Sequence, residues 1–158
     1  MKSICFDFDN IGGISRLYAI PVSSFVRIRK DYVKNLNYLE CRDLFSIIEI
    51  PVYTDNTFSF TENQTFDTPG DGYNIEISGI IPKMMPVNSS DIGLLERGEW
   101  YVLCEDRNGN VKFSGDENVR LKFTSRKESG AAFIDHNQIS FTFSCLQENP
   151  SVDIIDNF

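Results

Sequence analysis

The feature that most constrains the fold is a series of short alternating segments separated by turn signals between residues 99 and 146. Apolar and polar residues alternate through VRLKFTS (119–125) and ISFTFSCL (139–146), and another strand-like run, EWYVLCE (99–105), precedes the Asn108-Gly109 dipeptide. Strict alternation is typical of strands with one buried face, and Asn-Gly favours a tight hairpin turn. The pattern predicts a β-meander whose turn spacing suits a sandwich or a barrel.

The first two thirds of the chain add more strands and one short helix. Strand-like segments cover residues 14–20, 22–29, 44–53 and 73–81. Pro82 and Pro86 are expected to end the last of these strands, and Ser89 or Ser90 can then cap a helix of about one to two turns that stops at Gly98. The chain holds 13 Phe but only three Ala, the strongest helix former, so composition also favours strands.

These observations predict a mainly β protein, a β-sandwich or barrel with one short helix and a projecting arm. The chain of 158 residues has room for a single domain, which we place at residues 1–150. The acidic end, SVDIIDNF (151–158), is expected to be loose or bound by a partner.

Residues 54–72 have a different character from the rest of the domain. They are polar, rich in Thr and Asn, and end in Pro-Gly-Asp-Gly, with a turn expected at Glu62-Asn63. We predict a projecting hairpin or arm, because loops of this length in small domains usually serve function. Its phenylalanines, Phe58, Phe60 and Phe66, would need cover from a partner and form the predicted oligomer interface. The alternative, that they cap the domain's own core, stays open.

Charge and hydropathy exclude several classes of protein. The net charge is −8 and the pI is near 4.6, the wrong sign for gripping nucleic acid. No apolar run approaches the roughly 20 residues that a membrane helix needs, so no membrane partner is expected. The N-terminus MKSICFDFDN carries acids within its apolar stretch, which is not typical of a signal peptide.

The four cysteines are too far apart for an ordinary zinc site. Cys5, Cys41, Cys104 and Cys145 include no CxxC pair. Cys104 and Cys145 lie in apolar strand-like runs and are predicted to be buried thiols, in a reduced intracellular setting. A disulfide between these two cysteines on neighbouring strands is the alternative.

Three motifs imitate chemical sites without completing them. Asp7 and Asp9 follow an apolar run and resemble the first motif of haloacid-dehalogenase phosphatases, but Ile11 replaces the required Thr or Val and the chain lacks the helices of that fold. The DRNGN run (106–110) begins like a calcium loop, yet its glycine is misplaced and a hairpin turn is favoured. His136 is the sole histidine and sits in a predicted turn. We therefore predict no enzyme, no catalytic residue, no cofactor and no metal.

Two stretches resemble tail proteins of phages and prophages of the Bacteroidota. The first contains Cys5, IGGI (11–14) and LYAI (17–20). The second runs from Gly98 to Phe143 and contains GEWYVLCEDRNGNVKFSG, LKF, a Ser-Gly turn and DHNQISFTF. The order and spacing of these pieces carry the resemblance, which covers roughly half of the chain.

The resemblance implies a tail-tube-like or tail-ring subunit. Such proteins are β-sandwiches or barrels that stack as hexameric rings, with a long loop or hairpin reaching a neighbouring subunit or ring. The chain would then be a non-enzymatic virion protein, made in the host cytoplasm, whose partners are copies of itself and other tail proteins. An acidic channel would let DNA pass without sticking.

The residues alone leave a second function open. A β-sandwich can also be a binding module for a glycan or a host surface, which would require an exposed aromatic platform. Trp100 is the obvious residue for that platform, although its strand pattern predicts a core position.

Overall fold

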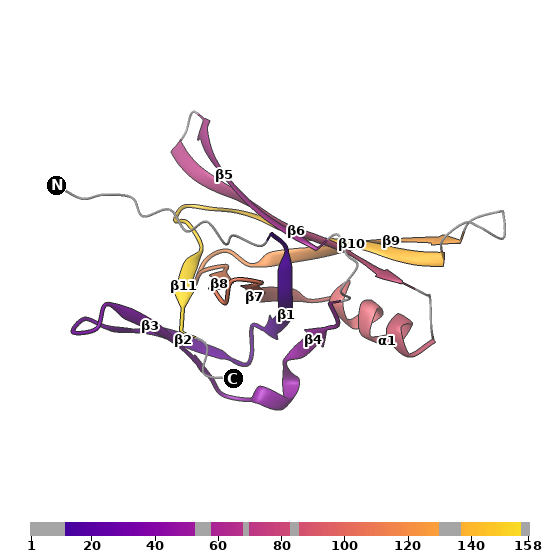
Figure 1. Cartoon of the computed structure of the whole chain (residues 1–158), viewed down its shortest axis with the longest axis horizontal. Coiled ribbons are helices and arrows are strands. Elements are labelled where there is room, and N and C mark those ends of the chain that lie inside the picture. The colour runs from indigo at the N-terminus through magenta and orange to yellow at the C-terminus, as the bar shows by residue number, and fades with distance from the viewer. Residues whose placement is uncertain (1–11, 53–57, 68–69, 83–85, 130–136, 156–158) are drawn as a thin grey trace.

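The computed structural model describes residues 12–52, 58–67, 70–82, 86–129 and 137–155. It is mainly β, as predicted, with antiparallel pairing throughout (Figure 1). The strands are β1 (Ile14–Pro21), β2 (Phe25–Asp31), β3 (Leu36–Cys41), β4 (Ile48–Ile50), β5 (Ser59–Asp67), β6 (Gly70–Pro82), β7 (Glu99–Asp106), β8 (Val111–Ser114), β9 (Leu121–Ser129), β10 (Asn137–Gln147) and β11 (Val152–Ile154). The helical elements are the 3-10 turn η1 (Leu44–Ser46) and the α-helix α1 (Pro86–Leu95).

The main sheet divides into two leaves at β7. Trp100, at the start of β7, pairs with Leu121 of β9, whereas Leu103 pairs with Phe113 of β8. The chain turns between β8 and β9 at Gly115, whose φ of +102° and contact with the Tyr101 ring exclude a larger residue. The first leaf is therefore β4-β1-β7-β8-β11, and the second leaf is β9-β10-β6-β5. The separate β2–β3 hairpin lies on the other side of the first leaf (Figure 1).

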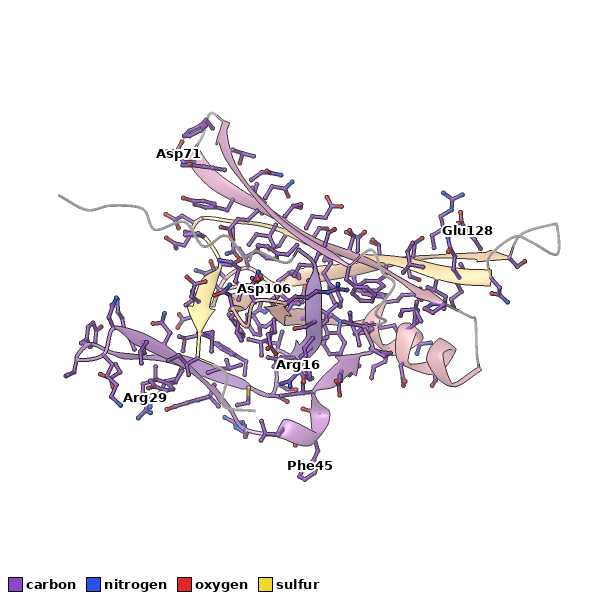
Figure 2. The ribbon with its side chains drawn as sticks, viewed as in Figure 1. Arg16, Arg29, Phe45, Asp71, Asp106 and Glu128 are labelled. Atoms are coloured by element: carbon purple, nitrogen blue, oxygen red, sulfur yellow. The ribbon has the colours of Figure 1, made fainter. Side chains whose placement is uncertain are left out.

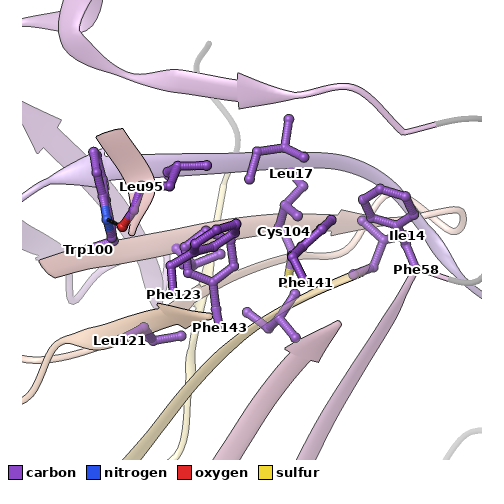
Figure 3. Packing of buried hydrophobic residues seen from close by; sticks show 14 of the residues in the cluster. Ile14, Leu17, Phe58, Leu95, Trp100, Cys104, Leu121, Phe123, Phe141 and Phe143 are labelled. Carbon is purple, nitrogen blue, oxygen red and sulfur yellow. Dashed lines mark hydrogen bonds between the residues drawn. The ribbon is translucent and has the colours of Figure 1, made fainter. Parts of the chain in front are cut away.

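The principal core lies between the two leaves, with α1 closing one end (Figure 3). Stacked and edge-on phenylalanines of the second leaf dominate it, with the Phe123 and Phe143 rings 4.9 Å apart. The first leaf contributes Leu17, Ala19, Trp100, Val102 and Cys104, and α1 contributes Ile92 and Leu95. Face-to-face packing of two leaves matches the sandwich prediction.

A second cluster explains why two strands are apolar on both faces. The alternate residues of β1 and β7 point to the β2–β3 hairpin and pack there with Phe113 of β8. They are Ile20, Tyr101 and Leu103. The runs LYAI and WYVLC are continuous rather than alternating because both strands are covered on each side.

Several predicted elements differ from the structure. The helix begins at Pro86, not near Ser89, and has 10 residues rather than one to two turns. Proline suits the first turn of a helix because that position needs no amide donor, so Pro86 starts α1 instead of only ending the preceding strand. The apolar run 44–53 forms η1 and the short β4 instead of one strand. Strand β3 lies between the predicted segments 22–29 and 44–53, where no strand was predicted.

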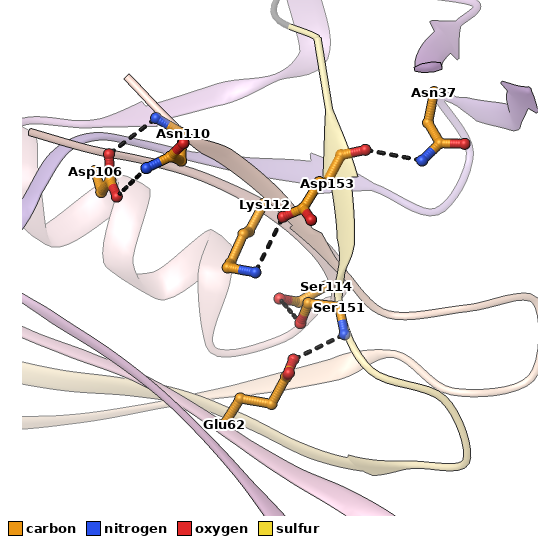
Figure 4. Close-up of polar contacts among 8 residues, drawn as sticks. All are labelled: Asn37, Glu62, Asp106, Asn110, Lys112, Ser114, Ser151 and Asp153. Atoms are coloured by element: carbon orange, nitrogen blue, oxygen red, sulfur yellow. Dashed lines mark hydrogen bonds and ion pairs between the residues drawn. The ribbon is translucent and has the colours of Figure 1, made fainter. Parts of the chain in front are cut away.

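The end of the chain is not loose through residue 155. Val152–Ile154 pairs with β8 as β11, and Ile154 is buried. The Ser151 amide donates a hydrogen bond to the Glu62 carboxylate at 2.7 Å, and the Ser114 and Ser151 hydroxyls lie 3.0 Å apart (Figure 4). The prediction of a loose tail is wrong here because these partners lie far away in sequence. Residues 156–158 are outside the described residues.

Candidate functional site

The β5–β6 hairpin projects from the body of the protein, and Asp71 lies near its tip (Figures 1 and 2). Its two strands pair continuously from Ser59 opposite Ser78 to Asp67 opposite Gly70. The predicted turn at Glu62-Asn63 is therefore wrong, because both residues lie inside β5 and have partners on β6. We call residues 59–72 the arm.

The three phenylalanines predicted to form one interface have different surroundings. Phe58 is 2% exposed, with its ring 5.4 Å from that of Phe141, so it is a core residue and cannot offer its side chain to a partner. Phe60 is half-buried against the same core. Phe66 is 74% exposed and is the one that an assembly partner can reach. The alternative, that these phenylalanines cap the domain's own core, is therefore correct for Phe58.

The outer edge of the arm is available for backbone pairing. In the described part of the chain, β5 pairs with β6 alone, which leaves its other edge free along nine residues. The opposite border of the same leaf is β9, which pairs with β7 only through Leu121 and Lys122. A long free edge is a template for another strand.

The face of the second leaf that points away from the core is mostly polar, with Ile80 and Leu146 as apolar members. Its hydroxyls bond locally, as shown by Ser59 and Ser78 at 3.0 Å and by Thr61, which donates to the Glu76 carbonyl. The residues on this face include Ser59, Thr61, Asn63, Thr65, Asn74, Glu76, Ser78, Lys122, Thr124, Arg126, Glu128, Ser140, Thr142 and Ser144. Among these residues the carboxylates of Glu76 and Glu128 offset the cations of Lys122 and Arg126, so most of the charge of −8 is carried elsewhere. We call this surface the hydroxyl face.

Sequence reasoning missed the β2–β3 hairpin as a surface of interest. Glu40 pairs with both Arg27 (2.8 Å) and Arg29 (3.4 Å), and the hydrogen bond from Arg27 is the main reason that the pKa of Glu40 is lowered. At the tip, Tyr32 is 83% and Val33 is 96% exposed. The alternating cations of RIRK were a detectable signal, but nothing in the sequence showed that the adjacent apolar pair would stay uncovered.

A pocket of about 270 Å³ lies between the base of the arm and the β7–β8 turn. Cys104, Asp106 and Lys112 contribute to its lining. Burial raises the pKa of the Cys104 thiol to about 12, so the thiolate needed for nucleophilic attack is absent at neutral pH. Lys112 forms an ion pair with Asp153 at 3.0 Å (Figure 4). These groups do not assemble a nucleophile with a base.

The DRNGN run is a hairpin turn, as predicted. Asp106 Oδ1 accepts hydrogen bonds from the Asn108 and Asn110 amides at 2.8 and 2.9 Å, and Gly109 has φ +81° (Figure 4). Burial acts to raise the pKa of Asp106, but the hydrogen bonds from the two asparagines outweigh it and lower that pKa. The carboxylate is thus occupied in holding the turn.

The other sequence-predicted positions give no assembled site. Cys41, Cys104 and Cys145 are free thiols, so the alternative Cys104–Cys145 disulfide is wrong. Cys5, Asp7, Asp9 and His136 lie outside the described residues. Within the described ranges, no group of three or more His, Cys, Asp or Glu side chains could hold a metal ion.

Trp100 does not form an exposed platform. It is 3% exposed, and its indole nitrogen donates to the Leu95 carbonyl at 2.9 Å (Figure 3). No helix in the described part of the chain is long and apolar enough to cross a membrane. No protein-family model, no curated protein and no solved structure matches the chain.

Proposed function

We propose that this protein is a non-enzymatic structural subunit that assembles with copies of itself into rings. Following the resemblance of its two stretches to tail proteins, we assign these rings to a phage tail, where they surround the DNA channel. The observation that carries the proposal is the outer edge of β5, nine residues long, which no other described strand pairs with and which lies on a hairpin that projects from the body. Proteins usually protect such an edge or use it for pairing.

The two borders of the second leaf have complementary charge. Strand β5 contains Glu62 and Asp67 and no basic residue, whereas β9 contains Lys122, Arg126 and Lys127 against Glu128. Pairing β5 of one copy with β9 of the next continues the second leaf from subunit to subunit. A contact between two different borders is heterologous, and such contacts close into rings when the rotation permits.

The hydroxyl face would line the channel of such a ring. It is rich in short Ser, Thr and Asn side chains, and the charges of Glu76 and Glu128 offset those of Lys122 and Arg126. A surface without a net positive field gives DNA phosphates little to bind, so DNA can pass without being held. This differs from the acidic channel that fitted the resemblance to tail proteins.

The described residues hold no aromatic platform for the alternative, a glycan-binding module. Trp100 is buried between the leaves, and the exposed rings of Tyr32, Phe45 and Phe66 are in three separate parts of the chain. A flat glycan needs neighbouring aromatic faces, so we do not propose this function.

The test is a pair of substitutions at Asn63, an exposed residue of β5. Lysine placed there repels the basic β9 border and blocks the edge, so Asn63→Lys is expected to prevent ring formation. Asn63→Glu is the matched control, because it adds a charge of the opposite sign and keeps the borders complementary. Electron microscopy and sedimentation velocity measure the rings. Wild-type protein that stays monomeric at high concentration, or equal effects of both variants, would contradict the proposal.

A further inference from the structure

We infer that the tip of the arm docks on the tip of the β2–β3 hairpin of a second copy of this chain, giving a head-to-tail contact separate from edge pairing. Within the rings proposed above, this contact joins one ring to the next. That role in stacking rests on the proposed function. Two complementary surfaces, on hairpin tips that diverge from the body, support the contact (Figure 1).

The two hairpins carry opposite charge. Residues 59–82, which form the arm and the rest of β6, contain Glu62, Asp67, Asp71 and Glu76 and no Lys or Arg, a net charge of −4. Residues 25–41, which form the β2–β3 hairpin, contain four basic and two acidic residues, a net charge of +2. This positive hairpin belongs to a chain whose total charge is −8, so it is the natural acceptor for an acidic segment.

The surface that receives the arm is the tip of the β2–β3 hairpin, which we call the acceptor. The Asp31 side chain accepts hydrogen bonds from the Val33 and Lys34 amides at 2.9 and 3.1 Å and so fixes the turn. Val33 and Tyr32 are exposed beside it, and the Lys30 ammonium lies 5.6 Å from the centre of the Tyr32 ring. The tip thus offers apolar surface next to positive charge.

The tip of the arm, which we call the donor, offers an apolar ring next to negative charge. Phe66 and Asp71 are directly paired across β5 and β6, so they share one face of the arm. Both are exposed, and the Thr65 hydroxyl bonds to the Gly72 carbonyl at 3.2 Å between the same strands. An exposed ring beside a carboxylate suits a partner that presents an apolar side chain beside a cation.

The contact must join two molecules. Asp71 and Arg29 mark hairpins that diverge from one half of the body, one toward the top and one toward the bottom of the view, with β11 between them (Figures 1 and 2). The arm cannot fold back to the β2–β3 hairpin of its own chain. Two different surfaces on one molecule produce head-to-tail addition, which extends without limit unless it closes.

The first experiment tests charge pairing by reversal. Asp67→Lys with Asp71→Lys in one variant and Lys30→Glu with Lys34→Glu in another are each expected to weaken head-to-tail association of the full chain by about 10-fold or more, measured by sedimentation velocity at low salt. Combining all four substitutions exchanges the signs of the two tips, because the charge of residues 66–72 changes from −2 to +2 and that of residues 30–34 from +1 to −3. The combined variant is therefore expected to recover most of the association. Leu146→Ser, an exposed residue on the other face of the second leaf, is the control and should change nothing. If the combined variant is no stronger than the two separate ones, the inference fails.

The second experiment tests direction. A chain with Phe66→Ser keeps its acceptor, and a chain with Val33→Ser keeps its donor, so each associates poorly alone while their mixture regains one contact. Ring stacks that end after two rings, or 1:1 dimers if no rings form, are the expected product of the mixture. Wild-type rings that never stack would overturn this inference and leave the ring intact. Dimers in the mixture without any rings would overturn the ring proposal and leave the docking contact standing. A mixture no more associated than either variant would overturn the docking.

Discussion

Gly79 lies directly beneath the ring of Phe58, so close that an added Cβ would lie 2.9 Å from Phe58 Cδ1 and 3.0 Å from Phe141 Cζ. This contact fixes the base of the arm on the principal core. It also explains why Phe58 is buried while Phe66, near the tip, is exposed, although both residues belong to one polar stretch of sequence.

Gly79→Ala should destabilise the fold, because the new methyl group overlaps two aromatic rings that the core holds on both sides. We expect a loss of about 1–3 kcal/mol in the free energy of unfolding, measured by urea denaturation. Gly93→Ala is the control: no atom lies within 4 Å of the added Cβ in α1, and alanine favours helix, so it should stabilise by up to about 1 kcal/mol. Equal effects of the two substitutions would contradict this packing.

Alanine substitutions of Phe58, just before the arm, and of Phe66, near its tip, should separate folding from assembly. Phe58→Ala removes a buried ring and is expected to cost about 3–5 kcal/mol of unfolding free energy. Phe66→Ala removes an exposed ring and should change that free energy by no more than about 0.5 kcal/mol. Thermal and urea unfolding of both variants check this. A large loss for Phe66→Ala would show that the tip is packed on the body.

Trp100 reports directly on the core because it is the only tryptophan. Its burial and its hydrogen bond to Leu95 predict a blue-shifted emission that iodide quenches poorly in the native protein and strongly after unfolding. Efficient quenching by iodide in the native state would contradict the buried position and would make Trp100 a candidate for a binding surface again.

The buried thiol of Cys104 and the partly buried thiol of Cys145 predict a loss of stability at high pH. Burial raises the pKa of Cys104 to about 12 and that of Cys145 to about 11, from 9.0. Above pH 9 the unfolded chain releases these protons while the folded chain retains them, so the stabilisation is complete below pH 9 and declines as the pH rises toward the folded values. The urea concentration at the midpoint of unfolding should therefore decrease as the pH is raised from about 8 to about 10.5. In Cys104→Ala the decrease should be smaller. The same slope in both proteins would show that Cys104 is not the cause.

DNA should pass the protein without being held. The balanced charges of the hydroxyl face and the total charge of −8 predict no shift of double-stranded DNA in a gel assay at about 0.15 M salt. The hairpin with reversed charge, Lys30→Glu with Lys34→Glu, should behave identically. Tight binding that disappears in that variant would place DNA on the β2–β3 hairpin instead.

Local patterns account for the parts of the fold that depend on nearby residues. The DRNGN turn forms because Asp106 binds amides two and four residues ahead, an interaction that the sequence displays directly. The start of α1 at Pro86 could not be told from the sequence, because a proline there is compatible both with the end of a strand and with the beginning of a helix. The turn at Asp106 and the start of the helix at Pro86 both depend on the preferences of single residues and their near neighbours in sequence.

Long-range contacts account for what could not be predicted. The tail is ordered through residue 155 because the Ser151 amide reaches Glu62, 89 positions away, and because Asp153 reaches Lys112. Alternation could place Phe58 and Phe60 on strand-like positions, but it could not tell which of them meets Gly79. The candidate assembly surfaces depend on the strand order, which puts β5 and β9 at the two borders of one leaf.

Native mass spectrometry of the full-length protein across a range of concentrations tests the central claim most directly. The account predicts a closed oligomer whose mass is a fixed integer multiple of 18.1 kDa, which disappears in Asn63→Lys and persists in Asn63→Glu. A single species of 18.1 kDa at the highest concentration would contradict the proposal that this chain builds rings.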